Sequence, residues 1–494
     1  MSAGQAGDVT FTLTVSGLPP DAFHVVNFSG EERLNGDYAF EMTILSRQNK
    51  LKPKDLIGRD ASFAIESRRE GLPVRVPYHG MIGEFTILRQ VFEETEYRAT
   101  LVPRISTLAL SEYSEVYTLE KDISGILEEV LKEAGFTSQD YQFKIVDGGR
   151  QRSFVCQYRE TPRQFLDRWA EREGIVYYFD HSGEKERVIF YDQPHQKPSW
   201  TKTLTYRPPG ELDIGFSDDS LIELHETARP LPGKVVVQDF NYRKANLEIR
   251  EEEILDPRAE TLLEEYGDNL RTNAEAKRQV KILSEMVRCR EQTFSGTSSA
   301  MEIRAGTTIR VRSHFREEMN TSFLVVRAHF EGSMMETSSG GESPLGQGRF
   351  TTFFDAILSD VPFRPERRTP WPRIPGVVQA VIEAEGSGKF AEINEYGEYK
   401  VRFPFALTKR KTQKGSGWIR LATPLAGSEN GIHFPLHRDS EVLVAFLEGD
   451  PDQPVIVGAL HNSEGRNLIS NKNPEMNIIR SAGGHFLMLN DGNL

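Results

Sequence analysis

The sequence predicts a mainly β protein with an α/β insert, and three observations support this fold class. The first hundred or so residues contain short β-rich segments separated by turns rich in Gly and Pro, a spacing typical of a small barrel or sandwich. Two capped amphipathic helices follow between residues 110 and 200. Residues 374–462 then contain five strand candidates with Gly-rich turns, which matches the size of an OB-type barrel.

The N-terminal strand candidates are short, rich in β-branched and aromatic residues, and several alternate with polar residues. Turn sequences such as GLPPD, LNGD and REGLP separate them, because Gly and Pro favour turns over regular strands. The candidates are residues 9–15, 38–45, 61–66, 80–88 and 97–102. They predict a first small β-barrel over residues 1–110.

Two helices are marked by their ends as well as by their apolar spacing. Asp122 precedes apolar residues at helical intervals and can cap the first helix, which Gly135 can close. In the second helix Thr161 is placed as the N-cap, and Gly174 follows the last turn. A polar turn then joins two β-rich runs in IVYYFDHSGEKERVIFYD, which predicts a hairpin. Together these segments predict an α/β insert over residues 111–205.

Strand-rich sequence returns over residues 206–360, with one helical stretch around residues 257–290. A faint internal echo links residues 56–85 with residues 302–332, because both contain a Gly, a strand, a charged turn and a strand that ends near an aromatic residue. A duplicated small barrel, split by the α/β insert, would explain the echo. Chance likeness between two β-hairpins would explain it equally well. The first interpretation predicts a second small β-barrel over residues 206–360.

Residues 361–376 are predicted to be a Pro-rich connector, since PFRPERRTPWPRIPG contains five prolines. Proline at this density favours stiff, extended polyproline geometry over helix or sheet. The segment also carries Arg364, Arg367, Arg368 and Arg373. We interpret these side chains as part of a solvated linker in preference to a docking patch.

The OB-type domain is predicted over residues 377–465, and its strand candidates are rich in Val and Ile. They are residues 377–384, 400–403, 417–422, 442–447 and 454–460. After residue 462 the chain becomes polar and then ends in the apolar, strand-like segment NIIRSAGGHFLMLNDGNL. That segment is too short to bury itself, since a lone hairpin is marginally stable in water.

Composition argues against several functional classes. The formal net charge is −13, whereas broad binding to nucleic acid or anionic membranes needs clustered Lys and Arg. Only two cysteines occur, Cys156 and Cys289, without a CxxC pattern, which is typical of cytosolic thiols and not of a disulfide framework. The sequence opens without a basic and apolar leader, and no run of about 18 apolar residues occurs, so we expect neither a signal peptide nor a membrane span.

Two pairs of side chains could suggest chemistry. His433 and His437 in HFPLH are the tightest histidine pair, but Pro435 between them argues against the helix that would point both at one metal ion. Asp450 and Asp452 flank a proline, a pattern more typical of a turn capped by Asp than of the paired carboxylates of a glycosidase. We therefore expect a metal site at neither pair and a turn at the second.

Known catalytic motifs do not occur in the sequence: there is no GxSxG elbow, P-loop, HExxH or dinucleotide fingerprint. Cys156 lies in the strand-like run SFVCQY and is expected to be a buried small residue rather than a nucleophile. The basic stretch at residues 409–414 is interpreted as a solvated loop in preference to a nucleic-acid groove of an OB fold. We expect no catalytic residues, no metal ions and no cofactors.

Several segments together resemble one protein family. Residues 156–181, CQYRETPRQFLDRWAEREGIVYYFDH, resemble a family segment in which a strand leads into a helix and then an aromatic strand, and residues 360–382 resemble the entry to the family's OB domain. The most specific match is FLEGDPDQPVIVG, which follows the strand of GWIRLATPLAG. The family-motif residues of the OB domain are Trp418, Gly449, Asp450, Pro451, Pro454 and Gly458. On these motifs the sequence is similar to the VgrG spike of type VI secretion, and through it to hub and spike proteins of contractile phage tails.

The resemblance implies a structural protein that is not an enzyme. It implies a homotrimer in which two related barrels per chain form a pseudo-sixfold hub that caps a tube of Hcp hexamers. The OB domain would form a neck, and a trimeric β-prism that starts within residues 466–494 would form the piercing spike. A PAAR-type tip protein and effectors or adaptor proteins would be further partners. The protein would stay in the bacterial cytoplasm before firing and then leave through the type VI apparatus, without stable membrane insertion.

The sequence departs from the family pattern in two places. PLAGSENGIHFPLH stands where the family has a tryptophan-containing turn, so the surface of that loop cannot be carried over. The long repetitive β-prism is nearly absent, so that either the needle is short or the chain is a piece of a longer protein. The apolar side chains expected to form the shared core of the trimeric spike are Ile478, Ile479, Phe486, Leu487, Met488 and Leu489.

A phage or phage-like baseplate hub is the alternative interpretation of the same motifs. An OB-fold nucleic-acid-binding protein or a cell-wall hydrolase is less favoured. A lysozyme domain, for example, would need room that the short polar stretch between the OB-type domain and the terminal strands does not offer.

Overall fold

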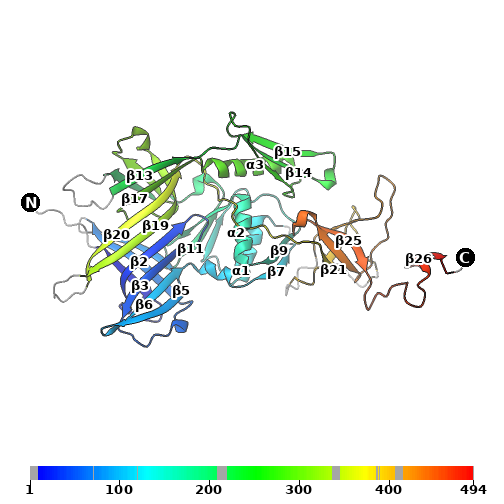
Figure 1. Cartoon of the computed structure of the whole chain (residues 1–494), viewed down its shortest axis with the longest axis horizontal. Coiled ribbons are helices and arrows are strands. Elements are labelled where there is room, and N and C mark those ends of the chain that lie inside the picture. Colours follow the sequence, from blue (N-terminus) through cyan, green and yellow to red (C-terminus); the bar gives the residue numbers. More distant parts are fainter. Residues whose placement is uncertain are drawn as a thin grey trace, which may run out of the picture. The chain divides into compact units, whose positions relative to one another are not determined.

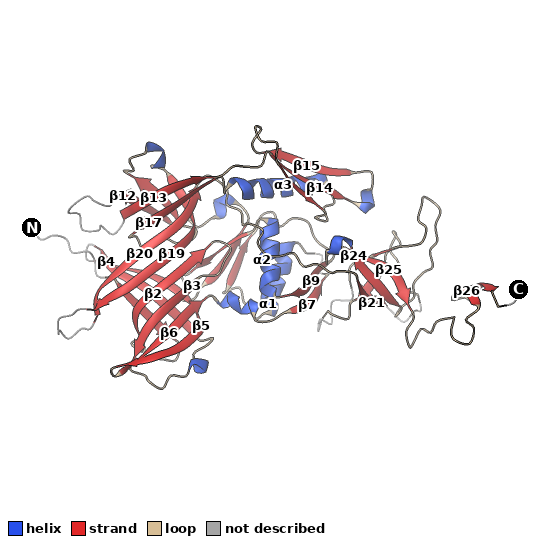
Figure 2. Cartoon of the chain, viewed as in Figure 1, coloured by secondary structure: helices blue, strands red, loops and turns tan. Residues whose placement is uncertain are grey.

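The structure is a computed structural model in which strands dominate over helices (Figure 1, Figure 2). It describes residues 9–69, 72–118, 121–207, 220–336, 345–384, 388, 390–406 and 416–492. The chain divides into two compact units. Unit 1 comprises Met1–Leu110, Leu127–Gly149 and Leu166–Thr369, and unit 2 comprises Ser111–Ile126, Arg150–Phe165 and Pro370–Leu494. Among the described residues, no helix is both long enough and apolar enough to span a membrane.

Unit 1 is built around a 12-stranded sheet. In chain order its strands are β1 (Thr10–Val15), β2 (His24–Arg33), β3 (Ala39–Ser46), β4 (Asp60–Arg69), β5 (Leu72–Val91), β6 (Glu94–Val102), β12 (Thr201–Tyr206), β13 (Ser220–Ala228), β17 (Gln292–Ser298), β18 (Thr308–Arg312), β19 (Ser322–Glu336) and β20 (Leu345–Leu358). Their spatial order is β1-β4-β5-β6-β3-β2-β19-β18-β12-β13-β17-β20.

A further pairing of β19 with β20 closes the last six strands into a barrel. The first six strands form a curved half-barrel that continues into this barrel where β2 pairs with β19 (Figure 2). The predicted fold class, mainly β with an α/β insert, is therefore confirmed. The first of the two predicted barrels is an open half-barrel, because its strand β2 pairs with a strand of the closed barrel.

Aromatic side chains fill the half-barrel. The ring of Phe28 lies between Phe11 and Phe63, with centroid distances of 4.9 and 4.8 Å. The ring of Phe40 packs 4.3 Å from Tyr78 and 5.7 Å from Phe330 of β19. Such rings bury a large apolar area each, so the core of the half-barrel depends on a strand that also belongs to the closed barrel.

The internal echo of the sequence corresponds to two antiparallel strand pairs. Strand β4 pairs with β5 in the half-barrel, and β18 pairs with β19 in the closed barrel. The echo therefore has one copy in each part of the sheet. Strand β2 was missed by the sequence prediction, because HVVNFSGEER mixes polar residues with a Gly and shows little strand pattern.

The helices α1 (Ile123–Glu133) and α2 (Pro162–Glu173) begin and end where the sequence predicts. The carboxylate of Asp122 accepts a hydrogen bond from the Gly125 N–H at 2.8 Å. Thr161 and Gln164 form a reciprocal capping box, with N–H to side-chain oxygen distances of 2.9 and 3.1 Å. The predicted hairpin is confirmed as β10 (Val176–Asp180) and β11 (Arg187–Tyr191), and β8 (Tyr141–Lys144) pairs in parallel with β11.

A separate layer lies between β13 and β17 in the sequence. Strands β14 (Lys234–Phe240), β15 (Glu248–Ile254) and β16 (Leu262–Tyr266) form a sheet in the order β15-β14-β16, and α3 (Asn273–Arg288) packs on it through Val237, Val280 and Leu283 (Figure 1). The predicted helix over 257–290 is correct only for its second part. Its first part is strand β16, which is held by parallel pairing to β14 that local sequence does not encode.

The Pro-rich connector has no regular structure, as predicted, but it is anchored. Arg364 is only 6% exposed. Its guanidinium forms a 2.7 Å ion pair with Glu285 and donates hydrogen bonds at 2.7 Å to the carbonyl oxygens of Gly174 and Asp192. A buried guanidinium needs such partners because desolvating its charge is costly. The connector is therefore fixed to the ends of α2 and β11 and to α3.

The solvated-linker interpretation of the connector arginines is wrong for two of the four side chains, and a third, Arg373, donates a hydrogen bond to the Glu448 carbonyl oxygen at 2.7 Å. Arg364 and Arg367 contradict it, since Arg367 forms an ion pair with Glu265 of β16. The side chains of Arg368 and Arg373 are exposed. An extended backbone lets side chains alternate between the protein and the solvent, which composition alone cannot resolve.

Unit 2 contains a five-stranded barrel whose strand candidates were all predicted. The strands are β21 (Val377–Glu383), β22 (Lys400–Arg402), β23 (Arg420–Leu421), β24 (Glu441–Phe446) and β25 (Pro454–Leu460), in the order β22-β21-β24-β25-β23. Backbone hydrogen bonds between Tyr399 and Ile419 join its two outer strands. Ile382, Val444 and Ile456 lie in its buried core.

The core of this barrel also includes residues from the predicted α/β insert. Val116 and Cys156 belong to the ribbon of β7 (Tyr113–Tyr117) and β9 (Val155–Glu160), and both pack in the same apolar cluster as Val444. The predicted domain boundaries remain predictions. The compact units of the structure follow these long-range contacts rather than a simple succession along the chain.

Candidate functional site

The family-motif residues Gly449, Asp450, Pro451 and Pro454 meet in one tight turn between β24 and β25. The turn begins with a short 3-10 segment, Leu447–Gly449. Glu448 and Gly449 both have positive φ angles, of 53° and 75°. Glycine takes this conformation without steric cost, so the Gly at 449 is explained by the backbone.

Asp450 and Asp452 act as hydrogen-bond acceptors in this turn. The Asp450 carboxylate accepts from the Asp452 N–H at 3.0 Å, from the Gln453 side chain at 3.0 Å and from the Trp371 indole at 3.1 Å. Asp452 accepts from the Cys156 N–H at 2.6 Å. Both carboxylates are nine-tenths or more buried. The turn predicted for this pair is confirmed, and its partners Trp371 and Cys156 were missed.

The other motif residues lie outside the turn. Gly458 pairs with Leu443 beside a bulge between β24 and β25. Trp418 is half-buried, and the Lys400 ammonium lies 4.8 Å from its ring centroid. Gly458 and Trp418 therefore form no single site together with the residues of the turn. A lone Trp in the Pro-rich connector was the one sequence signal that could have suggested a partner for Asp450.

The terminal hairpin of β26 (Met476–Arg480) and β27 (Phe486–Asn490) carries all six predicted spike residues. Directly opposed residues of an antiparallel pair share a face. One face carries Ile478 opposite Met488, together with Phe486. The other face carries Ile479 opposite Leu487, together with Leu489. Both faces are therefore apolar.

The hairpin is exposed in the single chain. Ile479, Phe486, Leu487, Met488 and Leu489 are between 48% and 64% exposed. Adjacent apolar side chains on this scale are rare on monomeric surfaces and mark contact sites. The hairpin alone cannot supply the burial that stabilises a strand pair.

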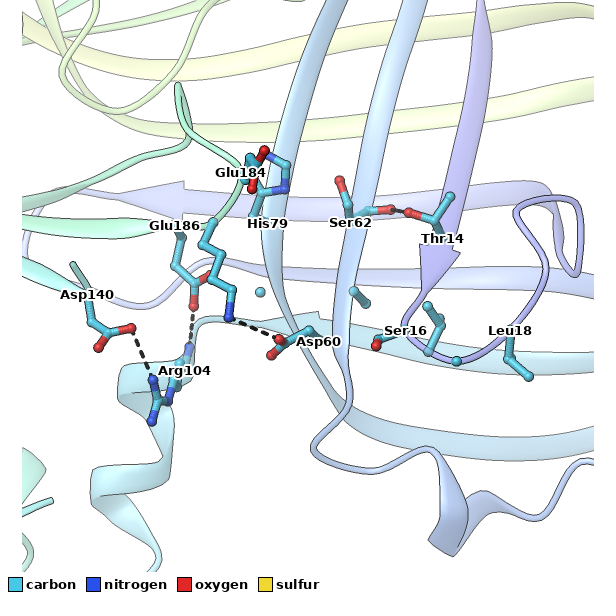
Figure 3. Close-up of a pocket in the computed structure, with 15 residues that line it drawn as sticks. Thr14, Ser16, Leu18, Asp60, Ser62, His79, Arg104, Asp140, Glu184 and Glu186 are labelled. Carbon is cyan, nitrogen blue, oxygen red and sulfur yellow. Dashed lines mark hydrogen bonds and ion pairs between the residues drawn. The ribbon is translucent and has the colours of Figure 1, made fainter. Parts of the chain in front are cut away.

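A cavity in unit 1 has a volume of about 610 Å³ (Figure 3). Two ion pairs lie in its lining. Lys185 contacts Asp60 at 3.3 Å, and Arg104 contacts Asp140 at 3.0 Å. The backbone N–H of Arg104 donates to Glu186 at 2.9 Å.

The electrostatics of this cavity follow from burial. Burial raises the pKa of Glu186, although hydrogen bonds from the backbone of Arg104 act against the rise. For His79 burial has the opposite effect and lowers the pKa, because it disfavours the protonated ring. A glycosidase needs two carboxylates poised across a sugar cleft, one as acid and one as base or nucleophile. Here three carboxylates, Asp60, Asp140 and Glu186, are engaged by cations or backbone N–H groups (Figure 3). The cavity is an ion-paired surface depression.

The two histidines of HFPLH contact different partners. The His433 ring lies 3.0 Å from the Tyr399 hydroxyl, and His437 packs edge-on against Phe390. Within the described ranges, no group of three or more His, Cys, Asp or Glu side chains could hold a metal ion. Cys156 is completely buried in β9, as predicted. The basic stretch at 409–414 lies outside the described residues.

The fold and the motif turn match a known class of protein. The profile of the phage tail baseplate hub (GPD) family matches residues 31–335. That span covers more than half of the chain, so the chain belongs to this family. The profile of the type VI secretion system/phage-baseplate injector OB domain matches residues 392–461, which include the motif turn.

Within that class the relatives are type VI spike proteins, so the resemblance to VgrG is confirmed. The spike protein VgrG1a of Pseudomonas aeruginosa is 26% identical over 460 residues, which cover 90% of this chain and 69% of that protein. VgrG1c of the same organism is also 26% identical, and this chain covers 61% of its length. The actin cross-linking toxin VgrG1 of Vibrio cholerae is 27% identical over 92% of this chain, and the chain spans 42% of it.

Solved structures share the fold. A type VI secretion component of E. coli, c3393, described as similar to the T4 bacteriophage tail proteins gp27 and gp5, aligns with a TM-score of 0.64 at 20% identity. The alignment covers 91% of this chain and 99% of that one. A chain of a Francisella PdpA-VgrG complex aligns with a TM-score of 0.64 at 11% identity, over 98% of this chain and 76% of that one.

Proposed function

We propose that this chain is a structural hub-and-spike component of a type VI secretion machine. In this role it assembles as a homotrimer, caps the tube of Hcp hexamers, and carries a PAAR-type tip, effectors or adaptors through the target envelope. The observation that carries the proposal is the terminal hairpin, whose two apolar faces are exposed in a single chain. Three chains that pair these strands would bury them, and Ile478, Ile479, Phe486, Leu487, Met488 and Leu489 would form their shared core.

The sheet of unit 1 supports the hub part of the proposal. Each chain contains one closed six-stranded barrel and one six-stranded half-barrel. Three chains around a threefold axis would present six similar surfaces, which suits docking to a hexameric tube. The proposed role is mechanical and requires no catalysis, metal ion or cofactor. The chain would wait in the bacterial cytoplasm and leave through the apparatus, with no stable membrane insertion and no nucleic-acid binding.

A phage or phage-like baseplate hub is the second candidate, because the family profile that covers unit 1 is that of phage tail baseplate hubs. The two candidates differ in the tube protein that they bind. Binding to purified Hcp hexamers supports the type VI assignment, and binding only to a phage tube protein supports the alternative.

Light scattering on the purified chain tests the assembly. We expect a mass three times that of one chain at micromolar concentration. The double variant Ile479→Asp, Leu487→Asp should be monomeric, because charges on this face cannot be buried between chains. The variant Asn477→Gln, on the same face but without an added charge, is the matched control and should remain trimeric. A wild-type chain that stays monomeric at micromolar concentration contradicts the proposal.

A further inference from the structure

The motif turn holds two distant segments of unit 2 by hydrogen bonds. On one side Asp450 accepts from the indole of Trp371 in the connector. On the other side Asp452 accepts from the backbone N–H of Cys156 in β9, at 2.6 Å and 296 residues away in sequence. Asp452 is 6% exposed and Cys156 is completely buried. The hydrogen bond is therefore shielded from water, and the low local dielectric strengthens it.

Strand β9 lies along the barrel without joining its sheet. It pairs with β7 in a two-stranded ribbon of its own. Tyr158 of β9 and Phe154, which directly precedes the strand, contact the barrel through ring pairs, with Phe405 at 5.5 Å and with Phe403 at 6.1 Å. These contacts are apolar and offer no hydrogen-bond acceptor to the backbone N–H of Cys156. A side chain, that of Asp452, supplies the acceptor.

The close approach of β9 to the barrel makes this acceptor important. A Cβ atom on Gly417 would lie 2.8 Å from the carbonyl oxygen of Ser153, just before β9, so there is no room for a larger residue where the chain enters the ribbon. An N–H buried at such a contact without an acceptor costs about 1–3 kcal/mol. Loss of the Asp452 oxygen would therefore favour separation of the ribbon from the barrel.

We propose that Asp452 is a positioning residue that latches the β7–β9 ribbon to the barrel. Strand β9 runs through Thr161 directly into α2. The latch therefore gives the barrel a second connection to the rest of the chain, beside the Pro-rich connector held by Asp450. The mechanical meaning of that connection rests on the proposed hub-and-spike function. The latch itself does not, because it acts within one chain.

The two cysteines allow a direct test by native-state thiol labelling with mass-spectrometric readout. Cys156 reports on the latch, and Cys289, 2% exposed in unit 1, is the internal control. We expect Asp452→Ala to increase the labelling rate of Cys156 at least tenfold, which equals about 1.4 kcal/mol of opening free energy. The labelling rate of Cys289 should not change.

Matched variants separate latching from general destabilisation. Asp452→Asn keeps an acceptor oxygen at the same position and should restore slow labelling of Cys156. Asp452→Ser, which is polar but too short to reach the Cys156 N–H, should behave like Asp452→Ala and serves if the alanine variant does not fold. Glu395→Ala changes an exposed acidic residue of unit 2 that has no positive φ angle, and it should leave both rates unchanged.

The proposal is overturned if both cysteines of Asp452→Ala accelerate equally, or if neither does. It is also overturned if Asp452→Asn labels as fast as Asp452→Ala, since the acceptor oxygen would then be irrelevant. Labelling is measured whatever the oligomeric state, whereas the trimer mass tests the proposed function. The two ideas can therefore fail independently.

Discussion

The barrel of unit 2 and the terminal hairpin that follows it in sequence are both made of short apolar strands, but their apolar side chains differ in burial. Ile456 in β25 is completely buried within its own chain, whereas Ile479 in β26 is 54% exposed. Strand β24 alternates between buried and half-buried residues, while every residue of β27 is exposed. Full burial of such a side chain contributes about 1.5–3 kcal/mol. The barrel gains this stabilisation alone, and the hairpin can gain it only from other chains.

The largest expected effect separates these two isoleucines. Ile456→Ala should destabilise unit 2 by about 2–5 kcal/mol, because it leaves a cavity in a packed core. Ile479→Ala should change the stability of the single chain by about 0.5 kcal/mol or less, as exposed substitutions do. Pulse labelling of Cys156 against urea measures both at a concentration at which the chain is monomeric.

At higher protein concentration, where the chains associate, the substitution in the hairpin should have a measurable effect. Ile479→Ala should then weaken the trimer, which light scattering over a dilution series detects. Equal effects of the two substitutions on the single chain would show that the hairpin is already packed within its own chain and would contradict the comparison.

A smaller effect is the pH dependence that buried His181 gives to the stability of unit 1. Burial, with the nearby charge of Arg304, holds the pKa of His181 well below its ordinary value. The unfolded chain takes up a proton below about pH 6.5 and the folded chain resists it. The stability that neutral His181 confers is therefore complete above that pH and is lost as the pH falls, by at most about 1.4 kcal/mol per pH unit.

His181→Asn should flatten this pH dependence. An Asn oxygen can replace the ring nitrogen Nδ1, which accepts from the His79 N–H at 2.9 Å. Urea midpoints of unit 1, followed by Cys289 labelling between pH 7.5 and 5.5, measure the slope. His225→Asn, at a side chain that is 67% exposed, is the control. An unchanged slope in His181→Asn would exclude this residue as the cause.

An effect of similar size concerns two glycines of the family motif. Gly449 has a φ of 75° and space around its Cβ position, so Gly449→Ala should cost about 1–2 kcal/mol from backbone strain alone. Gly458 has neither a positive φ nor a close neighbour, so Gly458→Ala should be neutral or slightly stabilising. Equal costs would mean that the turn tolerates a left-handed alanine.

Sequence reasoning succeeded where local chemistry decides the structure. Asp122, Thr161 and Gly174 set the ends of two helices through hydrogen bonds and φ angles within a few residues. The five barrel strands of unit 2 followed from apolar runs between Gly-rich turns. The motif turn was also predictable, because Asp450 caps a backbone N–H only two residues away.

Sequence reasoning failed where distant segments decide. Strand β16 exists because of parallel pairing with β14, and Arg364 is buried because Glu285 and two carbonyl oxygens surround it. The contact between Asp452 and Cys156 joins residues 296 positions apart. No local sequence pattern predicts such partners, because each contact depends on tertiary packing between distant segments.

Strand β19 sets the order in which the hub can be completed during synthesis. It supplies the partner of β2, and the pair Arg327–Glu31 is separated by 296 residues. At a translation rate of 5–20 residues per second, β2 emerges about 15–60 s before this partner. An unpaired strand edge is prone to association with other chains. The half-barrel is therefore finished late, although its strands are the first to be made.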